Sequence, residues 1–305
     1  MTIINCAAMR QKMFHARVAE WQTQWTQNPS IARSCEFDSR LGHKSIINYV
    51  PLFTSMIKNK RKSIDAFGRQ LWSSFKTGRP KYEIVERDDG FISVGKYGGE
   101  VYLSKYENWD KIERDAMKFV DGRVLDIGCG GGRHSLYLQK KGFDVTGIDN
   151  SPLSIKVSRL QGLKKARILP IKKIGEFKPN SFDSVIMMGN NFGLFGSYNL
   201  AKILLKKLYK ITSPTASIIA SSRDPYPTKD PVHIAYHKLN KKRGRMAGQL
   251  RLRIRYKNYI GNWFDYLFVS KDEIRKILKD TGWKIKRFIN AAGGQYIVIL
   301  NKRID

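Results

Sequence analysis

A glycine-rich stretch is the part of this sequence whose residue types could do chemistry. It reads VLDIGCGGGR over residues 124–133 and begins with a short apolar run. Glycine lets the backbone bend sharply and approach a ligand where any side chain would collide. Because the stretch opens a predicted helix, free N–H groups there favour anionic groups of a ligand. We therefore expect a nucleotide-like cofactor to bind at Gly128, Cys129, Gly130 and Gly132.

Two acidic residues lie close to this loop in the predicted fold. Asp126 comes two residues before the first glycine, and Asp149 ends a second predicted strand, residues 143–148. An acid at the tip of that strand can accept hydrogen bonds from both hydroxyls of a ribose. Asp126 stands where a nearby positive charge or an ordered water network would be organised. The predicted cofactor contacts therefore include Asp126, Asp149 and the adjacent Asn150.

The spacing separates this loop from the dinucleotide pattern G-x-G-x-x-G, which would need glycine where Arg133 stands. The acid inside the end of the first strand is also foreign to that pattern. The string VLDIGCGGGRHSLYLQKKGFDVTGID resembles motif I and the following acidic motif of class I S-adenosylmethionine-dependent methyltransferases. The resemblance covers about residues 85–305, is specific in these two motifs, and implies S-adenosyl-L-methionine as the cofactor.

The same resemblance implies an α/β fold with a doubly wound, mostly parallel seven-stranded sheet, an antiparallel last strand and a β flap inserted after strand five. We expect the strands at residues 123–127, 143–148, 166–171, 181–188, 216–222, 283–290 and 295–301. Helices are expected at residues 109–120, 133–141, 201–211 and 271–281, from their apolar spacing and glycine stops.

The segment after the fourth strand reads GNNFG, residues 189–193, where the family lines the methionine end of the cofactor and the acceptor. The resemblance therefore implies a cofactor contact at Asn190 and an acceptor contact at Asn191. One departure concerns adenine, because family members commonly carry an acid after the third strand and this register offers Ile171 and Lys172.

The predicted flap lies within residues 223–270 and contains the run LRLRIRY. Apolar residues alternate there with Arg251, Arg253 and Arg255, so one strand face is apolar and the other carries arginine. That arginine face could bind phosphate or carboxylate. We favour the alternative that it is the solvent-exposed face of a two-stranded flap, with residues 263–267 as the partner strand. The segments GNN, SSRDPY, YH and WFDYL resemble a group of small, largely uncharacterised methyltransferases.

Candidate acceptor-site residues come from this segment. Asp224 and His237 are the candidates for binding or deprotonating the acceptor, and Arg223 and Tyr236 for contacting it. A structural ion pair between Arg223 and Asp224 is an equally weighted interpretation. His233 and His237 have the spacing of two helical metal ligands, but no further ligand accompanies them, so we expect no metal.

The chain divides into three predicted regions: residues 1–55, a lead-in or cap at 56–108, and a methyltransferase domain at 109–305. Residues 1–55 resemble the translation of a transfer-RNA gene, since segments 18–21, 25–29 and 36–40 can encode the D, anticodon and T arms in order. We expect translation to begin near Met56; the alternative is a genuine N-terminal extension.

Charge and cysteine usage bear on partners and location. The 305 residues carry 56 Lys and Arg against 26 Asp and Glu, a net charge of +30. The electric field of such a charge would favour encounters with nucleic acid or anionic substrates. The slightly favoured interpretation is that the protein comes from a lysine-rich proteome, in which ordinary enzymes carry solvated lysines. Cys6, Cys35 and Cys129 show no metal spacing, and no membrane-length apolar run occurs, so we expect reduced thiols in a cytoplasmic protein.

The leading predicted function is methylation of a small molecule. The alternatives are RNA methylation and a non-catalytic cofactor-binding regulator.

Overall fold

A computed structural model describes residues 65–95 and 99–303. Residues 1–55, the predicted start near Met56, Cys6 and Cys35 lie outside the described residues. The main sheet has the order β11-β12-β7-β6-β3-β4-β5. Its strands are β3 (Arg123–Ile127), β4 (Asp144–Asp149), β5 (Lys165–Ile168), β6 (Phe182–Met187), β7 (Thr212–Arg223), β11 (Trp283–Asn290) and β12 (Gln295–Lys302). β3 to β7 are parallel and β12 is antiparallel to both neighbours, which confirms the predicted fold class.

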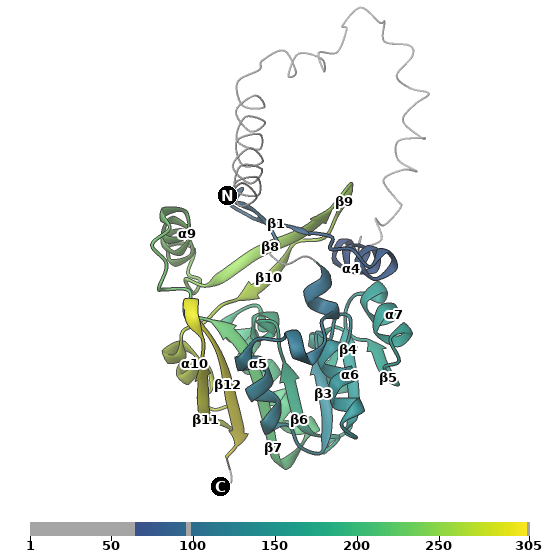
Figure 1. The fold of residues 1–305 in the computed structure, drawn as a ribbon. Coiled ribbons are helices and arrows are strands. Elements are labelled where there is room, and N and C mark those ends of the chain that lie inside the picture. The colour runs from purple at the N-terminus through teal and green to yellow at the C-terminus, as the bar shows by residue number, and fades with distance from the viewer. Residues whose placement is uncertain (1–64, 96–98, 304–305) are drawn as a thin grey trace, which may run out of the picture. The chain divides into compact units, whose positions relative to one another are not determined.

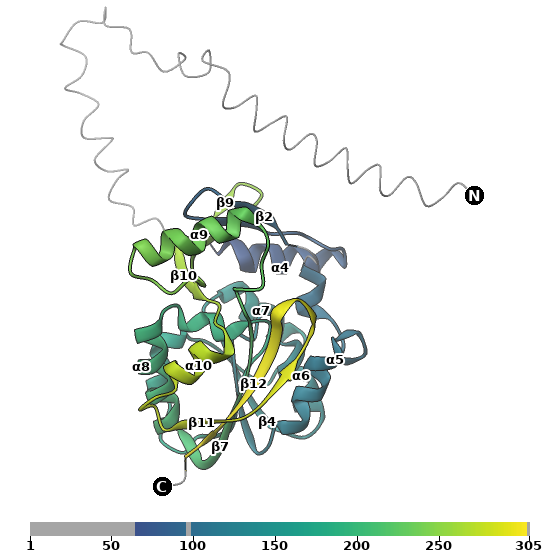
Figure 2. The same ribbon diagram turned by 90° about the vertical axis from the view of Figure 1, so that its left-hand side faces the viewer.

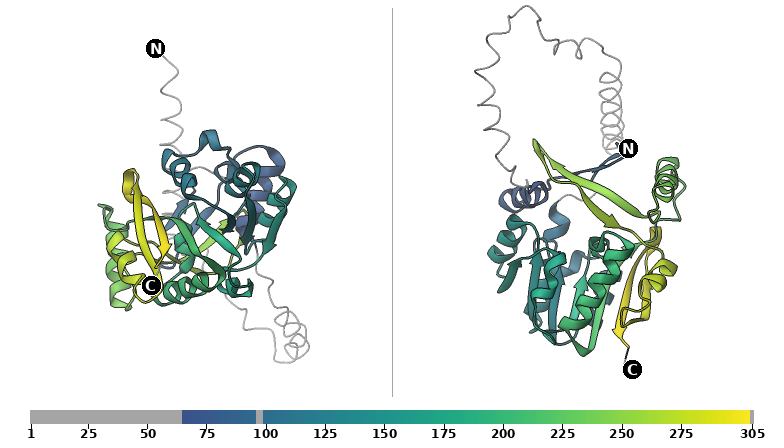
Figure 3. Two further views of the ribbon diagram at one scale, coloured as in Figure 1. Left: turned by 90° about the horizontal axis from the view of Figure 1, so that it is seen from below. Right: turned by 180° about the vertical axis from the view of Figure 1, so that it is seen from behind.

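Helices cover both faces of this sheet (Figures 1 and 3). They are α5 (Lys111–Ala116), α6 (Arg133–Lys140), α7 (Pro152–Leu160), α8 (Tyr198–Ile211) and α10 (Lys271–Ile277). Side chains of α5 and α6 pack with Val124 and Val145 on one face. The next residues along β3 and β4 point the other way, so Leu125 packs with α8 and α10 on the opposite face. The two apolar clusters hold the carboxyl ends of the parallel strands at one edge.

Local sequence explains these helices. α8 buries five apolar residues at helical spacing, and the Ser197 side chain caps it by accepting from the Leu200 N–H. α7 was not predicted from the sequence, although Ser151 at its N-cap and Pro152 in its first turn are signals for a helix start. Short 3-10 turns connect the other elements: η2 (Gly99–Leu103), η3 (Tyr106–Asn108), η4 (Met117–Phe119), η5 (Ile171–Glu176), η6 (Asn191–Phe195) and η7 (Ala292–Gly294).

A second, antiparallel sheet, here called the cap sheet, lies at the end of the domain where the glycine loop is found (Figure 1). It contains β1 (Ile84–Arg87), β2 (Ile92–Val94), β8 (Gln249–Tyr256), β9 (Tyr259–Ile260) and β10 (Phe264–Leu267). The predicted pairing within the flap is confirmed, because β8 and β10 pair in antiparallel register. The flap is wider than predicted, since β1 from the lead-in region pairs with β8 on its other side.

Two helices accompany the cap sheet, α4 (Ala66–Thr77) and α9 (Pro231–Lys242) (Figure 2). Asp65 caps α4 by accepting from the Gly68 N–H at 2.8 Å. The same carboxylate accepts from Ser151 Oγ at 2.7 Å and from the Leu153 N–H at 3.2 Å. One side chain thus joins the starts of α4 and α7 and ties the lead-in region to the sheet. No helix in the described part of the chain is long and apolar enough to cross a membrane.

Candidate active site

The glycine loop bends between β3 and α6 because three of its residues adopt conformations that only glycine accepts easily. Gly128, Gly130 and Gly132 have φ of 74°, 55° and 88°. The N–H groups of Gly128 and Cys129 donate to the Ile148 carbonyl at 2.8 and 3.0 Å, which fastens the loop to the neighbouring strand. A Cβ on Gly130 would meet no atom within 4 Å. At Gly130 the loop therefore presents bare backbone to open space.

Asp149 lies at the carboxyl end of β4, and its carboxylate is buried against this loop. One oxygen accepts from the Gly130 N–H at 3.0 Å and the other from the Ser151 N–H at 2.8 Å. Burial raises the pKa of Asp149 to about 6, although these hydrogen bonds pull it down. Each oxygen accepts one bond from the backbone and has lone pairs left for a further donor. This arrangement fits the two neighbouring hydroxyls of a ribose.

Asp126 lies beneath the loop, also buried, where it accepts from Ser135 Oγ at 2.6 Å. Burial raises the pKa of Asp126 to about 7, the Ser135 hydrogen bond lowers it, and the negative charge of Asp149 raises it again. Because the charge of Asp149 raises the pKa of Asp126, a bound group that brings positive charge or hydrogen-bond donors would stabilise the ionised carboxyl groups.

The raised pKa of Asp126 predicts a pH-dependent stability. Above pH 7 the protein must hold a buried charge that the unfolded chain leaves in water, and below pH 7 the group takes up a proton in the folded state. We expect Asp126→Asn to raise the free energy of unfolding by up to about 4 kcal/mol at pH 8, and by less than about 2 kcal/mol at pH 5, where the unfolded chain has lost this proton but the folded protein still holds it. Urea unfolding at both pH values measures this.

The matched control is Asp144→Asn, at the exposed start of β4, where Asp144 pairs with Lys165 at 2.6 Å. That change should alter stability by less than about 1 kcal/mol at either pH. An Asp126→Asn variant that is less stable than wild type at both pH values would contradict the account.

Cys129 and Arg133 contact the protein interior more than the loop's open side. The Cys129 side chain packs with Ile155, Leu163 and Ala166, and burial raises the pKa of its free thiol. Arg133 pairs with Glu113 at 2.5 Å, with both side chains largely buried. The residue that replaces the third glycine of the dinucleotide pattern thus anchors α5 to α6. Asn150, predicted as a cofactor contact, is exposed next to Asp149.

The loop after β6 connects the glycine loop to the cap sheet. Asn191 donates through Nδ2 to the carbonyls of Ile127 and Gly128 at 3.0 and 2.9 Å. Asn190 has φ of 66°, its N–H donates to Ser221 Oγ at 2.6 Å, and its carbonyl accepts from the Tyr266 hydroxyl at 2.7 Å. The structure thus brings Asn191 to the glycine loop, and it places Asn190 between Ser221 of β7 and Tyr266 of the cap sheet. The Asn191 side-chain amide is occupied by backbone carbonyls, so its acceptor contact stays a prediction.

The segment that lacks the family's usual adenine-binding acid forms the 3-10 turn η5. Ile171 packs against the core, and the Lys172 carbonyl accepts from Lys207 Nζ at 3.1 Å. The first acid along this segment is Glu176, at the end of the turn and paired with Lys173 at 3.6 Å. An adenine amino group would therefore have to be bound by backbone groups or from another element.

The predicted catalytic pair lies past the carboxyl end of β7, and no contact joins its two members. Asp224 accepts from the Tyr226 N–H at 2.9 Å. His237 lies on α9, with its ring centre 6.0 Å from that of Tyr226, and burial lowers the pKa of its imidazole. Arg223 is exposed, and no ion pair with Asp224 occurs among the described residues. The roles of Asp224, His237 and Arg223 stay predictions.

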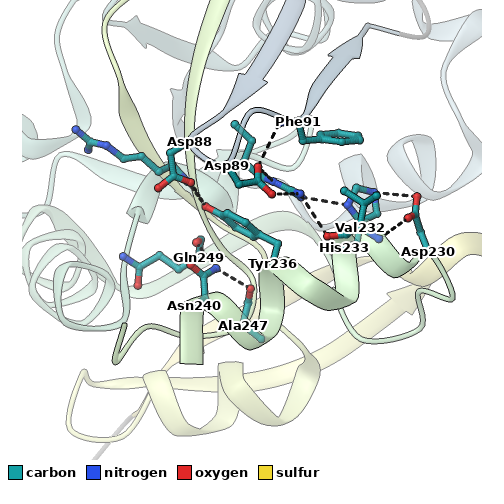
Figure 4. Close-up of polar contacts among 12 residues, drawn as sticks. Asp88, Asp89, Phe91, Asp230, Val232, His233, Tyr236, Asn240, Ala247 and Gln249 are labelled. Carbon is teal, nitrogen blue, oxygen red and sulfur yellow. Dashed lines mark hydrogen bonds and ion pairs between the residues drawn. The ribbon is translucent and has the colours of Figure 1, made fainter. Parts of the chain in front are cut away.

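Tyr236, predicted to contact the acceptor, lies in a polar network that fastens α9 to the turn after β1 (Figure 4). Its buried hydroxyl donates to Asp88 at 2.6 Å and accepts from the Arg251 N–H at 3.2 Å. Arg87 stacks on the Tyr236 ring at 4.0 Å and contacts His233 Nδ1 at 3.1 Å. Both polar functions of the hydroxyl are used within the cap, so an acceptor contact would have to come from the ring.

This network predicts a stability effect. Tyr236→Phe removes a buried hydroxyl and leaves Asp88 and the Arg251 N–H short of a partner, so we expect a loss of about 1–3 kcal/mol in urea unfolding. Tyr226→Phe is the control, because Tyr226 is 45% exposed and donates only to Glu273. Equal losses in the two variants would contradict the structural role of Tyr236.

The arginines of β8 are paired with acids of the same sheet. Arg253 and Arg255 both bind Glu86 on β1, and Arg251 contacts Asp265 on β10 at 3.2 Å. Glu86 lies directly across from Arg253 and diagonally from Arg255, and Asp265 lies directly across from Arg251. These contacts favour the interpretation of this face as the wet side of the flap over an anion site.

Three residues near the loop were not assigned a role from the sequence: Glu83, Tyr102 and Tyr266. Tyr266 belongs to the WFDYL segment, which was predicted to be a strand of the flap. The contact of Tyr266 with Asn190 was not predicted. A Cβ on Gly131 would lie 2.7 Å from the Tyr102 carbonyl, so the backbone of η2 rests on the glycine loop. No local pattern marks Glu83 or Tyr102, because Tyr102 meets the loop at Gly131, and Glu83 meets Tyr102, through contacts between segments distant in the sequence.

Comparisons with known proteins agree with this geometry. Residues 125–220 match the profile of a family described as a methyltransferase domain. A methyltransferase from Bacteroides fragilis, solved with S-adenosyl-L-homocysteine, superposes with a TM-score of 0.67 at 24% identity, over 79% of this chain and 95% of that one. One from Methanosarcina mazei gives 0.51 at 19% identity, over 65% and 99%. The chain therefore has the fold of class I S-adenosylmethionine-dependent methyltransferases, as its motifs predicted.

Curated relatives are similar to this chain over a short stretch. The ubiquinone biosynthesis O-methyltransferase of Bordetella parapertussis is 37% identical over 82 residues, which is 25% of this chain and 34% of that protein. The protein of the same name from Paracidovorax citrulli is 40% identical over 98 residues, 28% of this chain and 41% of its own length. The chain thus matches less than half of the length of either relative.

Proposed function

We propose that this chain is an enzyme that transfers a methyl group from S-adenosyl-L-methionine to a small-molecule acceptor. The observation that carries the proposal is the buried Asp149 carboxylate, whose two oxygens each accept one backbone N–H beside the open backbone of Gly130. When bound, the cofactor supplies a methyl group already activated by the positive sulfur. The protein's tasks are then to align the acceptor and to exclude water.

In this proposal, Asp149 holds the ribose, and the backbone at Gly128, Gly130 and Gly132 approaches the rest of the cofactor. Asp126 supports the loop through Ser135, and Asn190 lies at the methionine end. Tyr266 fixes the cap sheet above Asn190 and shields that end from water. No hydrogen bond or ion pair joins Asp224 and His237 in the described part of the chain, so we assign no proton transfer to that pair.

A small acceptor is favoured by the cap and by the relatives. The cap sheet closes over the region beyond Asn190, and the relatives' names describe O-methylation in ubiquinone biosynthesis. Nucleic acid is the second candidate, because the net charge is +30. The β8 arginines that could have contacted phosphates are paired with Glu86 and Asp265, which weighs against it. A cytoplasmic location, with Cys129 as a free thiol, is part of the proposal.

Incubation with methyl-labelled S-adenosyl-L-methionine and a size-fractionated cell extract tests the proposal. We expect label to enter the small-molecule fraction in an enzyme-dependent manner. Label in RNA would support the nucleic-acid candidate instead. Tight cofactor binding with no label in any fraction would point to a non-catalytic, regulatory protein.

A further inference from the structure

One face of the cap sheet, here called the inner face, is turned toward the core. Directly paired residues of neighbouring strands share a face, so Val85 lies with Ile254, and Leu252 with Phe264. Tyr266 is on the same face as these residues, two positions after Phe264 along β10. Because its hydroxyl donates to the Asn190 carbonyl at 2.7 Å, the inner face looks onto the end of β6, beside the glycine loop.

Two helices cover the ends of the inner face. At one end Arg69 of α4 lies 4.0 Å from the ring of Tyr259, and at the other Arg87 is stacked on Tyr236 of α9. The apolar side chains between these ends are only partly buried, and Phe264 is 36% exposed. They are Val85, Leu250, Leu252, Ile254 and Phe264. A flat apolar molecule packed against them would remove that surface from water.

Glu83 places a carboxylate beside this apolar surface. It comes two residues before Val85, and its carbonyl accepts from the Gly95 N–H at 2.9 Å, so the extended chain puts its side chain on the inner face. Only 7% of the residue is exposed. Oε1 accepts from the Tyr102 hydroxyl at 3.4 Å, whereas Oε2 is buried without a hydrogen-bond partner among the described residues. A buried, unpartnered carboxylate oxygen is costly unless a ligand supplies a donor.

Tyr102 connects Glu83 to the glycine loop. Its carbonyl lies against Gly131, and the edge of its ring packs on Phe67 of α4 with 5.0 Å between ring centres. Burial raises the pKa of the Tyr102 phenol, and the nearby charge of Glu83 raises it further, so the phenol remains a hydrogen-bond donor. Burial also raises the pKa of Glu83 above its usual range, as a proton-accepting group requires.

We propose that Glu83 binds and deprotonates the acceptor, and that the acceptor is a small aromatic molecule with a hydroxyl group whose ring packs on the inner face. This inference rests on the proposed methyltransferase function. As the acceptor oxygen forms a bond to the methyl carbon, the carbon–sulfur bond breaks and its electron pair returns to sulfur. The hydroxyl proton moves to Glu83 Oε2, so atoms and charge balance.

The test uses Glu83→Gln in the full chain, with Glu86→Gln as the matched control. Glu86 is on the same strand but on the outer face, paired with Arg253 and Arg255. Isothermal titration compares p-cresol, 4-methylanisole, which cannot donate a hydrogen bond, and S-adenosylhomocysteine. Label transfer to the small-molecule extract fraction is measured in parallel. Glu83→Asp is added as the variant that keeps a carboxylate.

We expect wild type to prefer p-cresol over 4-methylanisole, and Glu83→Gln to lose about tenfold in p-cresol affinity. S-adenosylhomocysteine affinity should stay within about twofold, while label transfer falls about 100-fold or more and Glu83→Asp restores part of it. Unchanged p-cresol binding and transfer in Glu83→Gln, or no preference for p-cresol in wild type, would overturn the inference. Loss of S-adenosylhomocysteine affinity in Glu83→Gln would make Glu83 a cofactor ligand and also overturn it. If wild type binds no S-adenosylhomocysteine, the proposed function itself fails.

Discussion

Asp149→Ala is expected to lower the affinity for S-adenosylhomocysteine by about 100-fold or more. The carboxylate would accept two charge-assisted hydrogen bonds from the ribose, and each such bond is worth about 1.5–3 kcal/mol. Its removal also frees the Gly130 and Ser151 N–H groups, which it holds at 3.0 and 2.8 Å, and so loosens the loop. Isothermal titration at pH 8 measures the affinity.

Asp144→Ala is the matched control, since it removes an acid from the other, exposed end of the same strand. Its affinity should stay within about twofold of wild type. If Asp149→Ala binds as tightly as Asp144→Ala, the ribose assignment is wrong and another element must hold the cofactor.

Gly193→Ala is expected to disconnect the cap sheet from the cofactor site. A Cβ at Gly193 would lie 2.2 Å from the Tyr266 ring, so the ring must move and its hydroxyl must leave the Asn190 carbonyl. We expect a loss of about 1–3 kcal/mol in the free energy of unfolding. Label transfer to the small-molecule fraction should fall about tenfold or more, because a displaced cap no longer aligns the acceptor. Urea unfolding and the labelling assay measure the two effects.

Gly175→Ala serves as the control for this change. Gly175 also has an ordinary φ, and a Cβ there would come no closer than 3.8 Å to another residue, the Lys207 side chain. This variant should behave like wild type in both assays. A Gly193→Ala variant with normal transfer would mean that the position of Tyr266 does not matter for the reaction.

The core of the fold could be predicted from the sequence because its signals are local. The apolar run before Gly128 and the glycine stop at Gly142 mark a strand and a helix end within a few residues. The acid at the end of the second strand follows from the same short unit. α7 was missed although Ser151 and Pro152 mark its start, so in this case a local signal was present and not used.

The cap could be predicted only in part, because its pairings join distant segments. The β8 and β10 strands are close in sequence and share a visible alternation, whereas β1 pairs with β8 across more than 160 residues. Nothing local to Glu83 shows that it would lie beside Tyr102. For the same reason Tyr236 was predicted as an acceptor contact, when its hydroxyl joins Asp88 in the turn after β1.

A crystal structure of the chain with S-adenosylhomocysteine would show directly whether Asp149 and the cap sheet hold the cofactor. We expect the ribose hydroxyls on the Asp149 carboxylate, the amino-acid end beside the glycine loop near Asn190, and the sulfur facing the inner face of the cap sheet. A cofactor whose ribose lies away from Asp149, or whose sulfur points away from the cap sheet, would contradict it.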